Sequence, residues 1–257
     1  MAFEKIKFFY KTGLVNMTAS VTDGDSRYSA SNLLDMREWK KWKGVGTSDT
    51  FQYPSSGPGA GANLTADYDI FSGHNLGSVG ATVVLQYSAT GAWAGEEVNA
   101  YTPFDPSDDK TKLKEFNSVT SPYWRRKLSG MSAAPIVAIS KWGEKVIFDH
   151  ASVLNDPNRQ KWHGVVNRSL DGTVIASYKD WVERILELKF SNRDSALYTK
   201  LDAWWEKIAT GLFFVAWETG AHGSDVWLVS SQEEYNNPLS MAGAGRNFNL
   251  SFRGRKE

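Results

Sequence analysis

Short runs of alternating or continuous apolar residues, separated by turns, make up the first part of the chain. Near its start Ile6, Phe8 and Tyr10 alternate with lysines, which is the period of a half-buried strand. Further along, the run 81–87 (ATVVLQY) is β-branched and apolar, and it predicts a central strand. The other strands predicted here are residues 124–128, 134–140 and 145–148, the last two flanking a hairpin turn at Trp142-Gly143-Glu144. Short strands at this spacing favour a β-sandwich over an α/β fold.

The second part of the chain is expected to open with a long hairpin. Within the strand that follows, residues 182–190 place Leu186, Leu188 and Phe190 on one face and charged residues on the other. After a helix, further apolar runs predict three more strands, at residues 212–217, 226–229 and 246–253.

The helix is predicted between these strands, where the apolar period changes. Asn192 or Asp194 can cap its start, and Gly211 can end it. Its apolar stripe consists of Leu197, Leu201, Trp205 and Ile208. These elements predict a small α+β domain with one amphipathic helix packed on a sheet.

A polar segment that breaks regular structure separates the two parts. It reads Asn155-Asp156-Pro157-Asn158-Arg159. We therefore expect a β-sandwich with N-terminal strands over residues 1–154, followed by the α+β domain over residues 160–257. The fold class is then mainly β.

Composition narrows the possible partners. Lys and Arg total 29, as do Asp and Glu, so the chain lacks the positive excess typical of nucleic-acid binding. It has no cysteine, which excludes disulfides, thiolate zinc sites and cysteine nucleophiles. Because no run approaches the ~18 apolar residues of a membrane span, we expect no membrane insertion. We expect no secretion signal at the N-terminus either.

Residues arranged for catalysis or cofactor binding are sparse. The four histidines show no metal-binding spacing, and a Gly-x-Ser-x-Gly motif is missing. His74 is expected to bond a loop backbone. Paired carboxylates of a glycoside hydrolase could still come from distant positions, but no pattern singles them out. We expect no enzyme activity and no cofactor.

One acidic loop leaves two interpretations open. Asp105, Asp108 and Asp109 offer clustered oxygen ligands of the kind that bind Ca²⁺. The loop lacks the glycine and distal glutamate of an EF-hand, so a solvated turn is favoured and a metal role stays open.

Aromatic side chains are the candidate ligand-binding groups, since the chain has 11 tryptophans. In the segment 37–43 (REWKKWK), Trp39 and Trp42 lie among four cations and could receive a sugar face or another protein. The alternative is that one of them anchors the core. Other candidates near predicted turns are Trp93, Tyr123 and Trp124.

The stretch from Ser29 to Asp149 resembles the discoidin-like, or galactose-binding-like, β-sandwich family. The resemblance is carried by Ser31-Asn32-Leu33-Leu34-Asp35, by residues 67–77 (DYDIFSGHNLG) and by residues 80–88 (GATVVLQYS). It implies a sandwich that binds sugars or proteins through loops at one end.

The C-terminal half resembles the terminal region of bacteriophage tail-tip and baseplate proteins, such as distal tail proteins. The carrying features are the strand at 182–190, the tryptophan-bearing helix and the closing sequence NPLSMAGAGRNFNLSFRGRKE. Together the resemblances imply a virion structural protein, made in the host cytoplasm, that forms a homo-oligomeric ring with other tail proteins as partners. The alternative is a carbohydrate-binding module that anchors a particle or an enzyme to a cell surface, with a host-surface glycan as ligand.

The terminal strand is the candidate for assembly. An open edge strand invites pairing with a neighbouring chain, and closed rings bury such edges by symmetry. The residues expected to act in assembly are Arg246, Phe248, Leu250 and Phe252.

Overall fold

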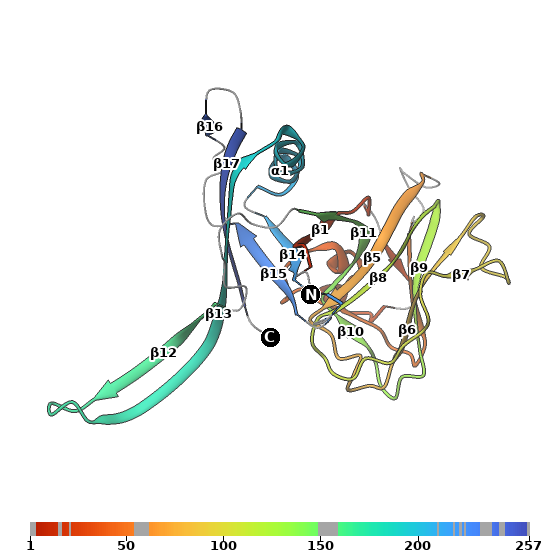
Figure 1. The fold of residues 1–257 in the computed structure, drawn as a ribbon. Coiled ribbons are helices and arrows are strands. Elements are labelled where there is room, and N and C mark those ends of the chain that lie inside the picture. Colours follow the sequence, from red (N-terminus) through yellow and green to blue (C-terminus); the bar gives the residue numbers. More distant parts are fainter. Residues whose placement is uncertain are drawn as a thin grey trace. The chain divides into compact units, whose positions relative to one another are not determined.

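The computed structural model describes residues 4–14, 17–20, 22–53, 62–148, 159–209, 211–217, 219–220, 223, 225–231, 238–241 and 245–255. Strands dominate these residues, which confirms the predicted mainly β class. The chain forms two compact units, drawn in Figure 1. We call Phe9–Lys145 the sandwich unit, and Met1–Phe8 with Val146–Glu257 the hairpin unit. The domain limits predicted from the sequence, 1–154 and 160–257, stay a prediction.

The sandwich unit contains two antiparallel sheets, which confirms the predicted β-sandwich. One sheet has the order β11-β5-β8, formed by β11 (Ile139–Ile147), β5 (Leu64–Ser72) and β8 (Lys112–Ser121). The other has the order β2-β4-β9-β6-β7, formed by β2 (Thr18–Ala19), β4 (Asp49–Tyr53), β9 (Tyr123–Ser129), β6 (Thr82–Ser88) and β7 (Val98–Asn99). The predicted strands at 81–87 and 124–128 correspond to β6 and β9.

Smaller elements complete this unit. Strands β3 (Trp42–Lys43) and β10 (Ile136–Val137) pair with each other. Two short 3-10 helices, η1 (Ser26–Tyr28) and η2 (Ala30–Leu34), precede β3. The first is capped by Asp25, whose side chain accepts a hydrogen bond from the Arg27 amide.

Large side chains from both sheets fill the core of the sandwich unit. One sheet contributes Phe51, Val83, Leu85, Trp124 and Leu128, and the other contributes Leu64, Ala66, Phe71 and Trp142. All are buried, and their contact removes apolar surface from water on both inner faces.

The hairpin predicted around Trp142-Gly143-Glu144 is wrong, because β11 runs straight through these residues. Trp142 is fully buried in mid-strand. Gly143 lies against the carbonyl oxygen of Lys11, and a Cβ at this position would collide with that oxygen. The glycine therefore permits close backbone approach in a strand rather than a turn.

The hairpin unit contains an antiparallel sheet with the order β12-β13-β17-β15-β14, and β16 pairs with β17. Its strands are β12 (Gln160–Arg168), β13 (Val174–Arg193), β14 (Leu212–Ala216), β15 (Val226–Ser231), β16 (Leu239–Met241) and β17 (Gly245–Arg255). The expected long hairpin is formed by β12 and β13, and the strands predicted at 212–217 and 226–229 are confirmed. Strand β1 (Lys7–Lys11) contributes residues to both units, as β11 does.

Helix α1 (Ser195–Ile208) packs on this sheet, as predicted. Asp194 caps it, because its Oδ1 accepts hydrogen bonds from the amides of Ala196 and Leu197, both at 3.1 Å. The predicted stripe needs one correction: Trp204 is fully buried, whereas Trp205 is only partly buried. The Trp204 ring lies 5.5 Å from the Phe213 ring. The helix ends at Ile208, before Gly211.

The predicted open edge at residues 246–253 is wrong. Strand β17 pairs with β13 on one side and with β15 and β16 on the other, so it lies inside the sheet. Phe248, Leu250 and Phe252 are buried in the core of the unit, as the alternating pattern indicated. These side chains stabilise the fold, and a role of Arg246, Phe248, Leu250 and Phe252 in assembly stays a prediction.

No helix in the described part of the chain is long and apolar enough to cross a membrane.

Candidate functional site

The structure separates the five aromatic residues proposed as ligand-binding groups. Trp42 and Trp124 are fully buried in the sandwich core. The Trp42 ring meets the Phe51 ring edge-on at 4.5 Å, and its Nε1 donates to Thr22 Oγ1. Trp39, in contrast, is 72% exposed. Of the two tryptophans in the segment 37–43, one therefore anchors the core and the other faces solvent.

A tight turn presents Trp39. The Lys40 amide donates to the carbonyl oxygen of Arg37 at 3.0 Å, which closes the turn around Glu38 and Trp39. Glu38 points inward, because its Oε1 accepts from the hydroxyl of buried Ser72 at 2.8 Å. The inward glutamate anchors the turn, so that Trp39 is held outward without a contact of its own in the core.

Two cations and a carboxylate surround the Trp39 ring. The Arg37 guanidinium lies 5.4 Å from the ring centroid, and the Lys40 ammonium lies 5.6 Å from it. Asp35 binds both cations, at 2.8 Å from Arg37 Nε and 3.0 Å from Lys40 Nζ. These interactions, led by the Arg37 hydrogen bond, hold the pKa of Asp35 well below its usual range. The carboxylate of Asp35 therefore stays charged at neutral pH.

A concavity of about 470 Å³ lies beside this turn. It is lined by Ser26, Arg27, Tyr28, Asn32, Trp39, Lys40 and Lys41. The Asn32 amide donates to the carbonyl oxygens of Arg27 at 2.7 Å and Lys41 at 2.9 Å, and so ties the two walls together. The sequence pointed to Trp39, Lys40 and Lys41 through the segment 37–43, but not to the lining residues from 26–28 and Asn32, because separate segments contribute them.

The surroundings of the concavity carry a positive excess. The cations are Arg27, Arg37, Lys40, Lys41 and Lys43, and the carboxylates are Asp23, Asp25 and Asp35. Asp25 pairs with Arg27, and Asp23 lies 2.9 Å from Lys43 Nζ. With Glu38, whose side chain is turned inward, five cations stand against four carboxylates, an excess of one positive charge. The concavity is thus suited to neutral or acidic ligands.

Trp93 lies at a different place, in the loop between β6 and β7, and Tyr123 at the start of β9 lies beside that loop. Trp93 has a φ of 55° and is partly buried under Arg125, whose guanidinium lies 4.3 Å from the ring centroid. Tyr123 is packed against Gly91. Glu96 accepts hydrogen bonds from Ser88, Thr90 and the Ala92 amide, and the Ser88 bond does most to lower its pKa to about 2. Both aromatic rings are thus packed where the β6–β7 loop meets β9, Trp93 against Arg125 and Tyr123 against Gly91.

The acidic loop uses its carboxylates internally. Asp105 accepts from Thr82 Oγ1 at 2.7 Å, Asp108 from the Lys110 amide at 3.0 Å, and Asp109 from the Ser78 amide at 2.9 Å. Within the described ranges, no three His, Cys, Asp or Glu side chains come together as a metal site would require.

His74 bonds loop backbone, as predicted. Its Nδ1 accepts from the Leu76 amide at 3.1 Å, which leaves Nε2 to donate to the Lys110 carbonyl oxygen at 2.8 Å. The side chain is 7% exposed. Its two nitrogens thus hold the residues after β5 against the residues before β8. His150 and His222 lie outside the described residues.

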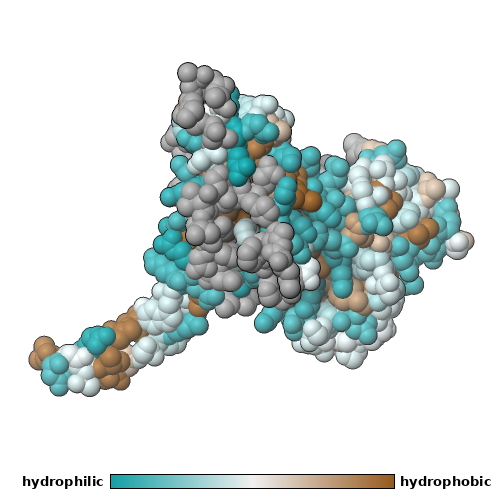
Figure 2. Space-filling model, viewed as in Figure 1, coloured by the Kyte–Doolittle hydropathy of each residue, from teal (hydrophilic) through white to brown (hydrophobic). Residues whose placement is uncertain are grey.

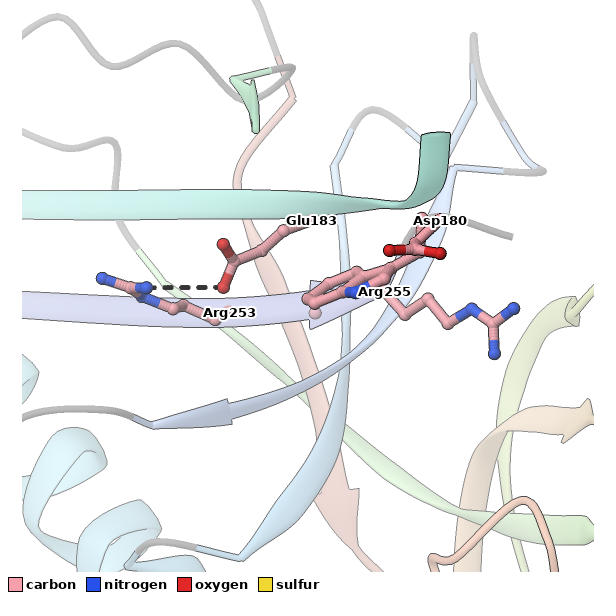
Figure 3. Close-up of a pocket in the computed structure, with 6 residues that line it drawn as sticks. Asp180, Glu183, Arg253 and Arg255 are labelled. Atoms are coloured by element: carbon pink, nitrogen blue, oxygen red, sulfur yellow. Dashed lines mark hydrogen bonds and ion pairs between the residues drawn. The ribbon is translucent and has the colours of Figure 1, made fainter. Parts of the chain in front are cut away.

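The hairpin unit has a second concavity, of about 500 Å³, shown in Figure 3. It is lined by Asp180, Trp181, Glu183, Arg253, Gly254 and Arg255. Glu183 is buried and bonds His163 Nε2 at 2.9 Å and Arg253 Nη1 at 3.4 Å. The His163 hydrogen bond is the main reason that the pKa of Glu183 is lowered. The His163 ring also stacks on Trp181, 4.2 Å away.

No family model and no curated protein matches the sequence. Solved structures with some similarity include a pectin-binding carbohydrate-binding module (TM-score 0.40, 14% identity, 56% of this chain and 96% of that one). A chitosan-binding module of a chitosanase/glucanase from Paenibacillus sp. IK-5 gives a TM-score of 0.42 at 14% identity, over 53% of this chain and 98% of that one. A carbohydrate-binding module from Clostridium perfringens, in complex with GalNAc-β-1,3-galactose, gives 0.40 at 15% identity, over 50% and 94%. None of these three is a phage tail protein.

Proposed function

We propose that the protein binds a carbohydrate through Trp39 and the concavity beside it. The observation that carries this proposal is the exposure of Trp39, 72%, on a turn whose other central residue is anchored inside the fold. An exposed indole ring offers a large apolar area that a ligand can cover.

The geometry suits a sugar ring better than a purely apolar ligand. One face of a pyranose consists of C–H groups, which an exposed indole face can cover, while its hydroxyls need polar partners around the edge. The lining supplies such partners in Ser26, Arg27, Asn32 and Lys41. Because the turn and the walls are already held by hydrogen bonds, little ordering entropy would be lost on binding.

The charge of the site favours a sugar with carboxylate groups. The excess of positive charge around the concavity attracts anions, and guanidinium and ammonium groups bind carboxylates by charge-assisted hydrogen bonds. We therefore expect a uronic-acid polymer to bind more tightly than a neutral one, and a polycationic polymer such as chitosan to bind least.

Binding is proposed without turnover. Of the carboxylates around the concavity, Asp25 is bound to Arg27 and Asp35 to Arg37, while Glu38 is turned inward and accepts from Ser72. A general acid needs a carboxyl whose pKa is raised, and the pKa of Asp25 and of Asp35 is lowered by their arginine partners.

The second candidate function is structural, as a component of a particle such as a phage tail. It is favoured by one observation, the eight large apolar side chains exposed on the β12–β13 hairpin. A structural role of this kind would make the protein part of a virion, and the same protein could also bind carbohydrate at Trp39.

Titration calorimetry with three defined probes tests the proposal: pectin, GalNAc-β-1,3-galactose and chitosan. We expect Trp39→Ala to weaken binding by about 1–3 kcal/mol, roughly five- to 150-fold, as for a central contact residue. Trp39→Phe should keep much of the affinity because it keeps an aromatic face. Trp93→Ala is the matched control and should bind as the unchanged protein does.

Two results would contradict the proposal. One is the absence of saturable binding to any of the three probes. The other is equal binding by the Trp39→Ala and unchanged proteins, which would move the site elsewhere.

A further inference from the structure

The β12–β13 hairpin extends well beyond the rest of its unit (Figure 1). We call residues 160–182 the arm. Its end is a tight turn in which the Gly172 amide donates to the Ser169 carbonyl oxygen at 3.0 Å, and Gly172 has a φ of +87°. The turn directs Leu170 into solvent, where it is fully exposed. The arm is therefore a finished hairpin with a defined end.

Apolar side chains gather on the arm (Figure 2). In the described part of the chain thirteen large apolar side chains are exposed, and eight of them belong to the arm. Both faces carry them, because Val165 lies opposite Tyr178 on one face, while Trp162, Val166 and Ile175 alternate onto the other. Exposure ranges from 40% at Trp181 to 110% at Leu170.

Such an arm is not expected to remain uncovered. A two-stranded ribbon is marginal in water by itself, and exposed apolar patches of this extent mark interaction sites. Aromatic side chains offer roughly 150–250 Å² each when free, and aliphatic ones less. At about half exposure, three aromatic and five aliphatic side chains present on the order of 600–800 Å², close to the area that one partner contributes to a standard interface.

The open edge of strand β12 can pair with the same edge of a second copy. Strand β12 is the last strand of its sheet and pairs with β13 alone within the described residues, so its other edge is open. Two identical edges can pair antiparallel about a twofold axis, because each residue then meets its counterpart in both directions.

The charges at the base of the arm also favour a second copy of this chain as the partner. Asp180 and Arg255 line the concavity of Figure 3, and neither forms an ion pair with another described residue. A surface that complements itself must carry both signs, as this one does. The chain as a whole has a formal net charge of zero, so two copies approach without long-range repulsion.

From these observations we infer that the arm is an interface between two copies of this chain. Paired β12 edges would form its centre, with the apolar faces of the two arms covering one another and the charged base forming its rim. This inference is independent of carbohydrate binding, since no residue of the Trp39 site takes part in it.

Sedimentation velocity of the full chain between ~1 and ~100 µM tests the interface. We expect a dimer or a higher closed oligomer. The double variant Val165→Glu/Ile175→Glu should weaken association by at least about tenfold, since it places charges on both apolar faces. Because both side chains are exposed, at 54% and 70%, the fold should survive the change. Val45→Glu/Val98→Glu, at comparably exposed positions of the sandwich unit, is the matched control and should associate normally.

The outcomes separate cleanly. Loss of association in the arm variant alone supports the inference. A protein that stays monomeric at every concentration overturns it, even if the arm then binds a different protein. An oligomer that the arm variant leaves intact also overturns it, since the interface must then lie elsewhere.

Discussion

A buried ion pair joins the two sheets of the sandwich unit, and its removal gives a sharply defined prediction. Asp69 on β5 and Arg126 on β9 are both fully buried and form the pair. Arg126 also donates to Ser140 Oγ and to the Ile70 carbonyl oxygen, and Tyr101 donates to Asp69 Oδ2 at 2.6 Å. Burial lowers the pKa of Arg126 to about 9, which still leaves it charged at neutral pH.

The expected loss of folding stability depends on which charge stays buried without its partner. Arg126→Met leaves the Asp69 carboxylate buried with Tyr101 as a hydrogen-bond partner, and breaking a buried pair in this way costs about 3–5 kcal/mol. Asp69→Leu should cost a similar amount. The double variant removes both charges and should cost far less, roughly 1–2 kcal/mol, mostly from the lost hydrogen bond of Tyr101.

Urea unfolding, followed by near-ultraviolet circular dichroism, measures the four proteins of this double-mutant cycle. The predicted coupling between the two sites is several kcal/mol, a large share of the ~5–15 kcal/mol that stabilise a typical domain. A cost below about 1 kcal/mol for Arg126→Met would refute this account. So would a double variant whose cost equals the sum of the single ones, because the two charges would then act independently.

Three further predictions concern single side chains. Asp49 is 1% exposed and its Oδ2 has no hydrogen-bond partner, so burial raises its pKa. Asp49→Asn should therefore raise the free energy of unfolding at pH 7, and this gain should vanish below about pH 3.9, where the carboxyl is protonated in both the folded and the unfolded state. An unchanged or lower stability of the variant at pH 7 would contradict this prediction. The pKa of Glu96 is shifted in the opposite direction, since hydrogen bonds lower it to about 2. Glu96→Gln should lower the melting temperature at pH 7. The difference in melting temperature between the two proteins should shrink as the pH falls from about 4.3 towards 2, whereas a purely steric defect would persist. Trp204→Ala should lower the free energy of unfolding by about 3–5 kcal/mol because it empties a buried site, whereas Trp205→Ala should lower it less because Trp205 is partly exposed. Equal losses for the two variants would contradict the assignment of Trp204 to the core.

Alternating patterns predicted strands well where one face is buried. Leu186, Leu188 and Phe190 are buried on β13, and Phe248, Leu250 and Phe252 are buried on β17. The same pattern could not reveal that β17 lies between other strands. Period-two alternation reports the two faces of a strand, whereas an edge is defined by pairing with residues far away in the chain.

Glycine and tryptophan were ambiguous for physical reasons. Gly143 looks like a turn residue, but it stands where the backbone of Lys11 comes too close for any side chain. Trp39 and Trp42 lie in the same cationic segment, but Trp39 is exposed and Trp42 is buried, because a turn closes between Arg37 and Lys40. Local composition does not contain the long-range contact that decides such cases.

The buried polar groups and the concavity beside Trp39 were the hardest to anticipate. Asp69 and Arg126 lie on strands of different sheets, and no spacing rule connects them. The walls of the concavity meet through backbone carbonyls of Arg27 and Lys41 held by Asn32. The resemblance to galactose-binding-like sandwiches indicated loops as the binding elements, but it did not indicate which ones.

The most direct test of the account is the indole N–H spectrum of the protein during titration with pectin oligosaccharides. The Trp39 signal can be assigned from its disappearance in Trp39→Phe. Binding at the proposed site should shift the Trp39 resonance while those of buried Trp42 and Trp124 stay in place. Saturable binding that leaves the Trp39 resonance unmoved, or that shifts Trp162 or Trp181 instead, would contradict the proposed site.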